Sequence, residues 1–231
     1  MTAHPKSIAI LGGTGFIGRA LCSQLSQLTH GPTEIRVLTR HRTKARALWV
    51  LPKVQVLEVN YRDEASLAEG LAGCEAVVNL VGLLHSRPGR PWGPDFDEAH
   101  VRLAARLARC MGRGQIRRLV HISAIGVSAT APSMYLRSKA AGEALLRGAE
   151  GLDVTVLRPS VVFGPEDQFV RLFAQLARWL PVIPLASPHA RFQPIYVGDL
   201  VRAIVQCLRE PKTIGQVYEP AGEDILTLYE V

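Results

Sequence analysis

The sequence predicts a doubly wound α/β fold, in which helices cover both faces of a parallel β-sheet. Short apolar segments alternate with helix-forming segments from residue 7 to about residue 160. The apolar segments are hydrophobic at consecutive positions, as expected for strands that are buried on both faces. A glycine-rich turn also follows the first of them. Strands that alternate with helices form right-handed βαβ units, which assemble into such a sheet.

Six strands and five helices are expected in this part of the chain. The apolar runs predict strands at residues 7–11, 34–38, 54–57, 76–81, 119–122 and 154–157. Apolar residues at helical spacing predict helices near residues 16–28, 42–48, 64–71, 97–111 and 136–149.

The pattern changes after residue 159, where prolines interrupt the chain repeatedly. We therefore expect one domain at residues 1–160 and a small substrate-side lobe at residues 161–231, interleaved with the first domain and adding no further sheet. Asp199 is placed to cap an apolar helix at residues 200–208. Residues 226–231 resemble the opening of another helix, so we expect the chain to continue beyond its last residue. One amphipathic helix would bury Phe169, Leu172, Phe173, Leu176 and Leu180.

Cysteine usage and hydropathy argue against a secreted or membrane-spanning protein. The four cysteines are far apart and form no CxxC pair, so neither a disulfide framework nor a metal site is predicted. The longest apolar runs are too short for a signal peptide core or a membrane span. We expect a cytoplasmic protein, which could still rest on the inner surface of a membrane. The cysteines are Cys22, Cys74, Cys110 and Cys207.

The formal net charge is +7. No nucleic-acid-binding motif accompanies this charge, so no nucleic-acid partner is predicted. Four arginines have helical spacing and would form one stripe, which is either a solvated face or a docking face for an acidic partner or an anionic lipid surface. They are Arg102, Arg106, Arg109 and Arg113.

The segment SIAILGGTGFIG at residues 7–18 predicts a dinucleotide site of the Rossmann type. Gly12 allows the tight turn after the strand, Gly15 lets the backbone approach a pyrophosphate, and Gly18 lets the helix pack on the strand. The N–H groups at the start of the helix can then receive the phosphates.

The residues after the second strand favour NADP(H) over NAD(H). Enzymes that use NAD usually carry an acid at this position, which binds the ribose hydroxyls. This chain has Thr39-Arg40-His41-Arg42 instead. Arg40, with Arg42 or Lys44, could clamp a 2′-phosphate. The alternatives, a solvated basic helix start and NAD(H) binding, stay open.

Tyr135 and Lys139 form a YxxxK pair that places both side chains on one helical face. A nearby ammonium and an oxidised nicotinamide would lower the pKa of Tyr135, so that it can exchange a proton with a substrate oxygen. Ser123 follows the fifth strand, at the edge of the sheet where active sites form, and could hold a carbonyl or alcohol. These three residues are the predicted catalytic group.

Together these residues resemble the short-chain dehydrogenase/reductase superfamily, in its extended and atypical branches. The similarity covers nearly the whole chain. It is strongest to the branch that contains the NADPH-binding accessory subunit of respiratory complex I and bacterial proteins described as NAD-dependent epimerase/dehydratase-like. The matching segments are GGTGFIG at 12–18, NLVG at 79–82, HISAIG at 121–126, YLRSK at 135–139, LRPSVVFGP at 157–165 and FQPIYVGDL at 192–200.

The resemblance implies further site residues. Asn60 and Tyr61 would contact adenine, and His85 would lie near the substrate mouth with the loop through Trp92. His100 occupies a helix position where many extended members carry Asn; for both histidines a solvated or packed side chain is the alternative. The remaining cofactor positions implied are Thr14, Phe16, Ile17, Leu80, Val81, Gly82, Pro159, Ser160 and Val161.

Two functions from different classes follow. The intact Ser123, Tyr135 and Lys139 favour an NADP(H)-dependent oxidoreductase, or an epimerase/dehydratase that uses its cofactor transiently. The resemblance and the arginine stripe favour a non-catalytic NADPH-binding accessory or assembly subunit of a respiratory NADH:quinone oxidoreductase. A regulator that senses NADP(H) would be expected to have a defective YxxxK pair. The oligomeric state stays open.

The aromatic residues of the lobe favour a small, apolar substrate, with packing in a core as the alternative. The lobe is also short for holding the second diphosphate of a sugar nucleotide. Phe163 and Phe192 are the expected substrate contacts, together with Phe169, Phe173 and Tyr196.

Overall fold

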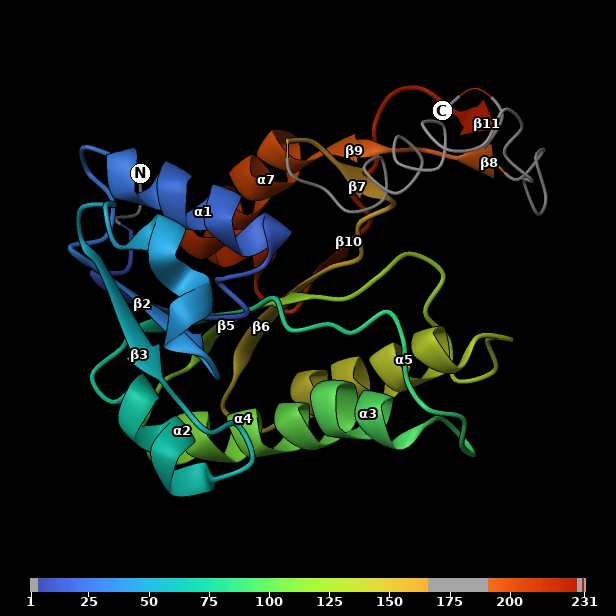
Figure 1. Cartoon of the computed structure of the whole chain (residues 1–231), viewed down its shortest axis with the longest axis horizontal. Coiled ribbons are helices and arrows are strands. Elements are labelled where there is room, and N and C mark those ends of the chain that lie inside the picture. The colour runs from blue at the N-terminus through green and yellow to red at the C-terminus, as the bar shows by residue number, and fades with distance from the viewer. Residues whose placement is uncertain (1–3, 166–190, 228–229, 231) are drawn as a thin grey trace.

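The computed structural model (Figure 1) describes residues 4–165, 191–227 and 230. The amphipathic helix expected around Phe169 lies outside these residues. The prediction of a Rossmann-type doubly wound fold is confirmed by one seven-stranded sheet in the order β10-β6-β5-β4-β1-β2-β3, in which all neighbouring strands are parallel. The strands are β1 (Ser7–Leu11), β2 (Glu34–Thr39), β3 (Val54–Glu58), β4 (Ala76–Asn79), β5 (Arg118–Ile122), β6 (Asp153–Leu157) and β10 (Val217–Tyr218).

Helices cover both faces of this sheet. In Figure 1, α1 and α7 lie above it, whereas α2, α4 and α5 lie below. The helical segments are α1 (Phe16–Gln27), α2 (Glu64–Leu71), α3 (Pro94–Phe96), α4 (Leu103–Arg113), α5 (Met134–Arg147) and α7 (Val197–Arg209), with 3₁₀ turns η1 (Arg42–Leu48) and η3 (Pro211–Thr213) and a π-helical turn η2 (Asp97–Arg102).

Each face of the sheet has its own hydrophobic core, because successive residues of a strand point to opposite faces. Ile8 and Ile10 of β1 belong to a cluster that includes residues of α1 and α7. Ala9 and Leu11 of the same strand belong to a second cluster, with residues of α2, α4 and α5. This two-sided burial is the reason for the unbroken apolar runs in the sequence.

The C-terminal part departs from the prediction in two ways. Val217–Tyr218 add β10 to the main sheet by pairing with β6, although no further sheet was expected there. Leu226–Thr227, where a helix was expected to open, form the short strand β11, which pairs antiparallel with β8 (Arg191–Phe192). In a third short pairing, β7 (Val162–Phe163) lies parallel to β9 (Ile195–Tyr196).

Two predicted boundaries are also wrong. Strand β4 ends at Asn79 because the Asn79 side chain accepts a hydrogen bond from the backbone N–H of Val81, at 3.1 Å, which turns the chain out of the sheet. Helix α7 begins at Val197, so Asp199 lies in its first turn rather than at the cap, and its carboxylate pairs with Arg202. Among the described helices, none is long and apolar enough to cross a membrane.

Candidate functional site

The turn between β1 and α1 requires glycine at two positions. Gly12 has φ +79°, and a Cβ there would lie 3.1 Å from the carbonyl carbon of Leu80. A Cβ on Gly18 would lie 2.5 Å from the carbonyl oxygen of Gly12, so α1 could not pack on the turn. Gly15 occupies the N-cap of α1 without a side chain, and its N–H donates to the Gly12 carbonyl at 3.0 Å. The backbone at the start of α1 is therefore open to close approach.

A cavity of about 230 Å³ opens beside this turn, and we call it the phosphate-loop cavity. It lies where the strand order reverses between β1 and β4, which is where open α/β sheets bind ligands. The structure brings many predicted residues to its wall. It adds Leu83, which sequence reasoning missed, and Thr39 and His41, to which it gave no role. The predicted lining residues are Gly12, Thr14, Gly15, Arg40, Lys44, Tyr61, Leu80, Val81 and Gly82.

A second cavity of about 440 Å³ adjoins the first, and we call it the outer cavity. Both cavities have Arg40, His41, Tyr61, Val81 and Leu83 in their walls. The outer cavity adds Asn60, which was predicted, and residues from β3, the loop after it and the helix after β4, which were not. Val59 and Arg62 flank the predicted Asn60-Tyr61 pair and Glu58 precedes Val59, so nearness in the sequence could have indicated these residues. The further lining residues that sequence reasoning missed here are Glu58, Val59, Arg62, Asp95, Glu98, Ala99 and Leu103.

Several predicted cofactor residues do not line either cavity. The backbone N–H of Arg42 donates to the Glu58 carboxylate at 3.1 Å. Pro159 and Ser160 are held by backbone hydrogen bonds with Ile125 and Pro220. The other members of this group are Phe16, Ile17, Gly18 and Val161.

Tyr61 is buried between β2 and the outer cavity. Its hydroxyl donates to the backbone carbonyl of Leu38. Burial raises the pKa of Tyr61 to about 12, so the phenol stays protonated and keeps this hydrogen bond at neutral pH. The ring is therefore fixed as part of the wall.

The predicted catalytic residues lie around the end of β5 and the start of α5. The buried Lys139 ammonium donates to the carbonyl oxygen of Ile122 at 2.6 Å. Ser123 is also buried, and its hydroxyl oxygen has no hydrogen-bond partner in the described part of the chain. Buried polar groups are nearly always satisfied, so an unpaired hydroxyl at a strand end points to a ligand.

Burial raises the pKa of Tyr135, whereas we expected Lys139 and an oxidised nicotinamide together to lower it. The Lys139 ammonium is directed at the Ile122 carbonyl, and desolvation therefore governs Tyr135. Burial also lowers the pKa of Lys139 to about 8, although the nearby Glu143 carboxylate acts in the opposite direction.

His100 connects the loop after β4 to α5. The backbone N–H of Leu83 donates to His100 Nε2 at 3.0 Å, so this nitrogen must be the acceptor. Nδ1 therefore carries the proton and donates to Ser138 Oγ at 2.8 Å, while the Ser138 hydroxyl donates to the Tyr135 carbonyl at 2.8 Å. Burial lowers the pKa of His100 to about 3, which keeps the ring neutral. His100 is therefore a packed side chain, which was one of the alternatives considered from the sequence.

Aromatic packing and a glycine hold Tyr135 against the π-helical turn. The rings of Phe96 and His100 are stacked at 5.4 Å, and Tyr135 meets both edge-on at 5.9 and 5.6 Å. Gly142 of α5 lies so close to η2 that a Cβ would be 2.0 Å from the His100 carbonyl oxygen. Single π-helical turns are frequent beside functional sites.

A second buried histidine, His121 in β5, was not predicted. Its Nδ1 atom has no hydrogen-bond partner in the part of the chain that the structure describes. Burial lowers its pKa well below the usual value, with smaller effects from Lys139 and His100 in the same direction. Its position in the segment HISAIG, directly before the Ile122-Ser123 pair, was the available signal.

Lys139→Met is expected to raise the free energy of unfolding by about 1–2 kcal/mol at pH 7, because it removes a buried charge at the expense of one hydrogen bond. Lys139 has a folded pKa of about 8 and an ordinary pKa of 10.5, so the unfolded chain binds the extra proton between these values. The contribution of Lys139 to the free energy of unfolding therefore rises with pH, by about 3 kcal/mol between pH 8 and 10.5.

Urea unfolding of wild type and Lys139→Met across this pH range measures the effect. Lys139→Met should have the higher free energy of unfolding at pH 7. This advantage over wild type should shrink and then reverse as the pH rises. A difference that stays constant with pH would contradict the burial of a charged Lys139.

The arginine stripe is paired with carboxylates of the same chain. Arg102 pairs with Asp97, Arg106 with Glu98, and both Arg109 and Arg113 with Glu64. The Arg113 to Glu64 distance is 3.1 Å. Three carboxylates therefore offset most of the charge of the four arginines, which weakens the case for a docking face.

The residues expected near the substrate are spread out. His85 is exposed and lines neither described cavity. Phe163 is 39% exposed and packs on Tyr196, with ring centroids 5.8 Å apart. Phe192 pairs with Leu226 in the β8–β11 ribbon. Phe169 and Phe173 lie outside the described residues.

A sequence profile of the NAD dependent epimerase/dehydratase family matches residues 8–219. The chain belongs to this family. Its relatives include NADH dehydrogenase (ubiquinone) 1 alpha subcomplex subunit 9 of Dictyostelium discoideum, 32% identical over 94% of this chain and 60% of the relative. Ceramide reductase of Caulobacter vibrioides is 30% identical over 88% of this chain and 61% of the relative. The chain thus spans about 60% of the length of these curated relatives.

Solved structures of two enzymes have the same fold. A double mutant of dTDP-glucose 4,6-dehydratase from Streptomyces venezuelae, solved with NAD, has a TM-score of 0.82 at 24% identity, covering 96% of this chain and 78% of that one. UDP-glucuronic acid 4-epimerase from Bacillus cereus, solved with UDP-glucuronic acid and NAD, has a TM-score of 0.81 at 20% identity, covering 97% and 80%. At these identities the similarity shows the fold alone.

Proposed function

We propose that this chain is an NADP(H)-dependent oxidoreductase in which Ser123, Tyr135 and Lys139 handle the proton of the reaction. The observation that carries the proposal is the buried Ser123 hydroxyl, which lacks a partner among the described residues and lies at the sheet edge that also bears the glycine turn. A nicotinamide cofactor would supply the hydride.

The residues present fit such a cofactor. The open backbone of the Gly12–Gly15 turn would hold the pyrophosphate, and Asn60 and Tyr61 would hold the adenosine end. Ser123 Oγ would donate to the substrate oxygen. Tyr135 would then give its phenolic proton to that oxygen, and its raised pKa favours the protonated form that reduction needs.

Arg40 and Lys44 support a preference for NADP(H). Both line the phosphate-loop cavity, where a 2′-phosphate would add two negative charges. Calorimetric titration should show that wild type binds NADPH roughly 10- to 100-fold more tightly than NADH, the range expected for charge-assisted hydrogen bonds. Arg40→Ala should remove most of this preference by weakening NADPH binding alone.

The matched control is Arg46→Ala. Arg46 is an exposed arginine on the 3₁₀ turn that follows Arg40, and it lines neither described cavity. Both nucleotides should bind this variant as they bind wild type. Equal binding of NADPH and NADH by wild type would contradict the preference.

The substrate that the site supports best is an apolar carbonyl compound. Exposed aromatic rings of Phe163 and Tyr196 lie together beyond the end of β6. Similarity to a ceramide reductase is consistent with an apolar substrate.

The second candidate is a non-catalytic accessory subunit of a respiratory NADH:quinone oxidoreductase. It is favoured by the similarity to NADH dehydrogenase (ubiquinone) 1 alpha subcomplex subunit 9 over 94% of the chain. This function would need the cofactor for stability rather than for turnover. Tyr135→Phe would then leave both cofactor binding and assembly unchanged.

A further inference from the structure

The wall of the outer cavity contains a carboxylate, Glu98, that Arg106 holds in place. Glu98 lies on η2, and Arg106 of α4 donates to its Oε1 atom. The Arg106 side chain is only 12% exposed, so this pair is largely shielded from water. No described residue donates to Glu98 Oε2, the second oxygen. Glu98 therefore presents a fixed acceptor at the cavity wall.

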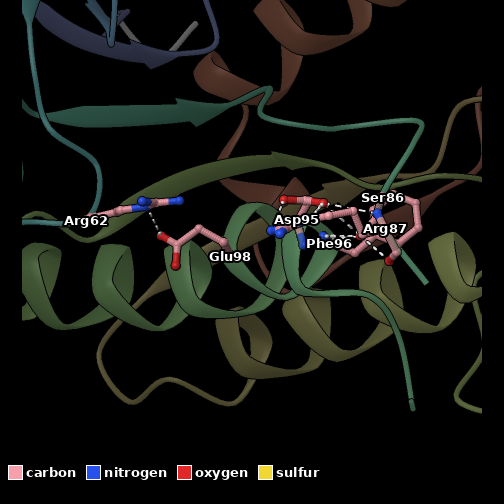
Figure 2. A network of polar contacts seen from close by, with 6 residues as sticks. All are labelled: Arg62, Ser86, Arg87, Asp95, Phe96 and Glu98. Atoms are coloured by element: carbon pink, nitrogen blue, oxygen red, sulfur yellow. Dashed lines mark hydrogen bonds and ion pairs between the residues drawn. The ribbon is translucent and has the colours of Figure 1, made fainter. Parts of the chain in front are cut away.

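Arg62 contacts the same oxygen atom of Glu98 as Arg106 does. It belongs to the loop after β3, and its Nε atom lies 3.7 Å from Glu98 Oε1 (Figure 2). The Arg62 side chain is 77% exposed, and this ion pair is too long to be a hydrogen bond. An exposed contact of this kind contributes little to stability, so Arg62 can move aside for a ligand and return.

The loop that carries Arg62 also carries Asn60. The backbone N–H of Arg62 donates to Asn60 Oδ1 at 3.0 Å, which occupies the acceptor of that side chain and leaves its amide hydrogens as donors. The cavity wall thus combines a carboxylate acceptor, an amide donor and a planar cation. A flat heterocycle with an exocyclic amine matches these three groups.

We propose that Glu98 selects the purine base of the dinucleotide by accepting a hydrogen bond from its exocyclic amine, and that Arg62 closes over the ring. This inference rests on the proposed cofactor function. Adenine carries an exocyclic amine, which donates a hydrogen bond. Hypoxanthine carries a carbonyl oxygen at the same ring position, and the Glu98 carboxylate repels it. The guanidinium of Arg62 can stack on the ring.

The experiment titrates NADPH and its deamino analogue, in which hypoxanthine replaces adenine, into the full chain by calorimetry. Wild type should bind NADPH at least roughly 10-fold more tightly than the analogue. Glu98→Gln should reduce this ratio to below about 3-fold, since the glutamine amide can donate to the hypoxanthine carbonyl. Arg62→Ala should weaken the binding of both nucleotides by roughly 3- to 10-fold and leave the ratio of the two affinities unchanged.

Arg102→Ala is the control, because Arg102 lies on the same turn as Glu98, pairs with Asp97 and does not line the cavity. It should leave both affinities unchanged. Equal binding of the two nucleotides by wild type, or an unchanged ratio in a folded Glu98→Gln, would overturn this inference alone. Failure of wild type to bind either nucleotide would overturn the cofactor function and this inference with it. Thermal unfolding of each variant establishes that it is folded.

Discussion

Gly142→Ala is expected to lower the free energy of unfolding by about 3 kcal/mol or more. The added Cβ would lie 2.0 Å from the carbonyl oxygen of His100 and 3.0 Å from its carbon, and neither atom belongs to a side chain that could turn away. Relief requires α5 to move off η2, which would also strain the hydrogen bond between His100 and Ser138. Urea unfolding followed by circular dichroism measures the loss.

Gly112→Ala provides the matched comparison. Gly112 is exposed near the end of α4, and a Cβ there would meet no atom within 4 Å. Alanine forms helix better than glycine, so this variant should be more stable than wild type by up to about 1 kcal/mol. If Gly142→Ala unfolds at the same urea concentration as wild type, the close contact between α5 and η2 is not present in solution.

Glu143→Ala is expected to destabilise the protein by about 3–5 kcal/mol, the usual effect of removing one partner of a buried ion pair. Glu143 is only 3% exposed, and its two carboxylate oxygens accept hydrogen bonds from Arg158 at 2.7 and 3.1 Å. The substitution would leave the Arg158 guanidinium without its buried partner. It would also remove the negative charge that raises the pKa of Lys139.

Glu219→Ala tests the same arginine on its exposed side. The Glu219 side chain is 50% exposed and lies 3.3 Å from Arg158. Exposed ion pairs contribute at most about 1 kcal/mol, so this variant should unfold close to wild type. If Glu143→Ala and Glu219→Ala lower the free energy of unfolding by similar amounts, burial of Glu143 does not set the strength of its ion pair with Arg158.

The sequence predicted the sheet well because its strands are covered on both faces. Such strands carry an unbroken apolar signal, and six of the seven strands of the main sheet lie where that signal was found. Strand β10 was missed because it is only the two residues Val217–Tyr218, too short for a periodic pattern. Strand β11 was missed because Leu226 obtains its partner from β8, far away in the sequence.

The candidate site was predicted in part for the same reason. Glycines and a YxxxK pair carry local signals, whereas the walls of the outer cavity come from separate segments. Glu98 and Arg62 are ordinary helix and loop charges in the sequence, and only the fold places them 3.7 Å apart. The pairing of Arg109 and Arg113 with Glu64 likewise depends on the packing of α2 beside α4. The direction of the Tyr135 pKa could not be predicted, because it depends on burial.

The measurement that tests the central claim most directly is the oxidation of NADPH by the full chain with a panel of apolar ketones, compared between wild type and Tyr135→Phe. We predict that wild type reduces at least one ketone and that Tyr135→Phe lowers this rate by roughly 10²- to 10⁴-fold, the usual contribution of a general acid, while still binding NADPH. NADPH that binds to both proteins and is oxidised by neither, with every ketone tried, would contradict the oxidoreductase and favour the accessory subunit.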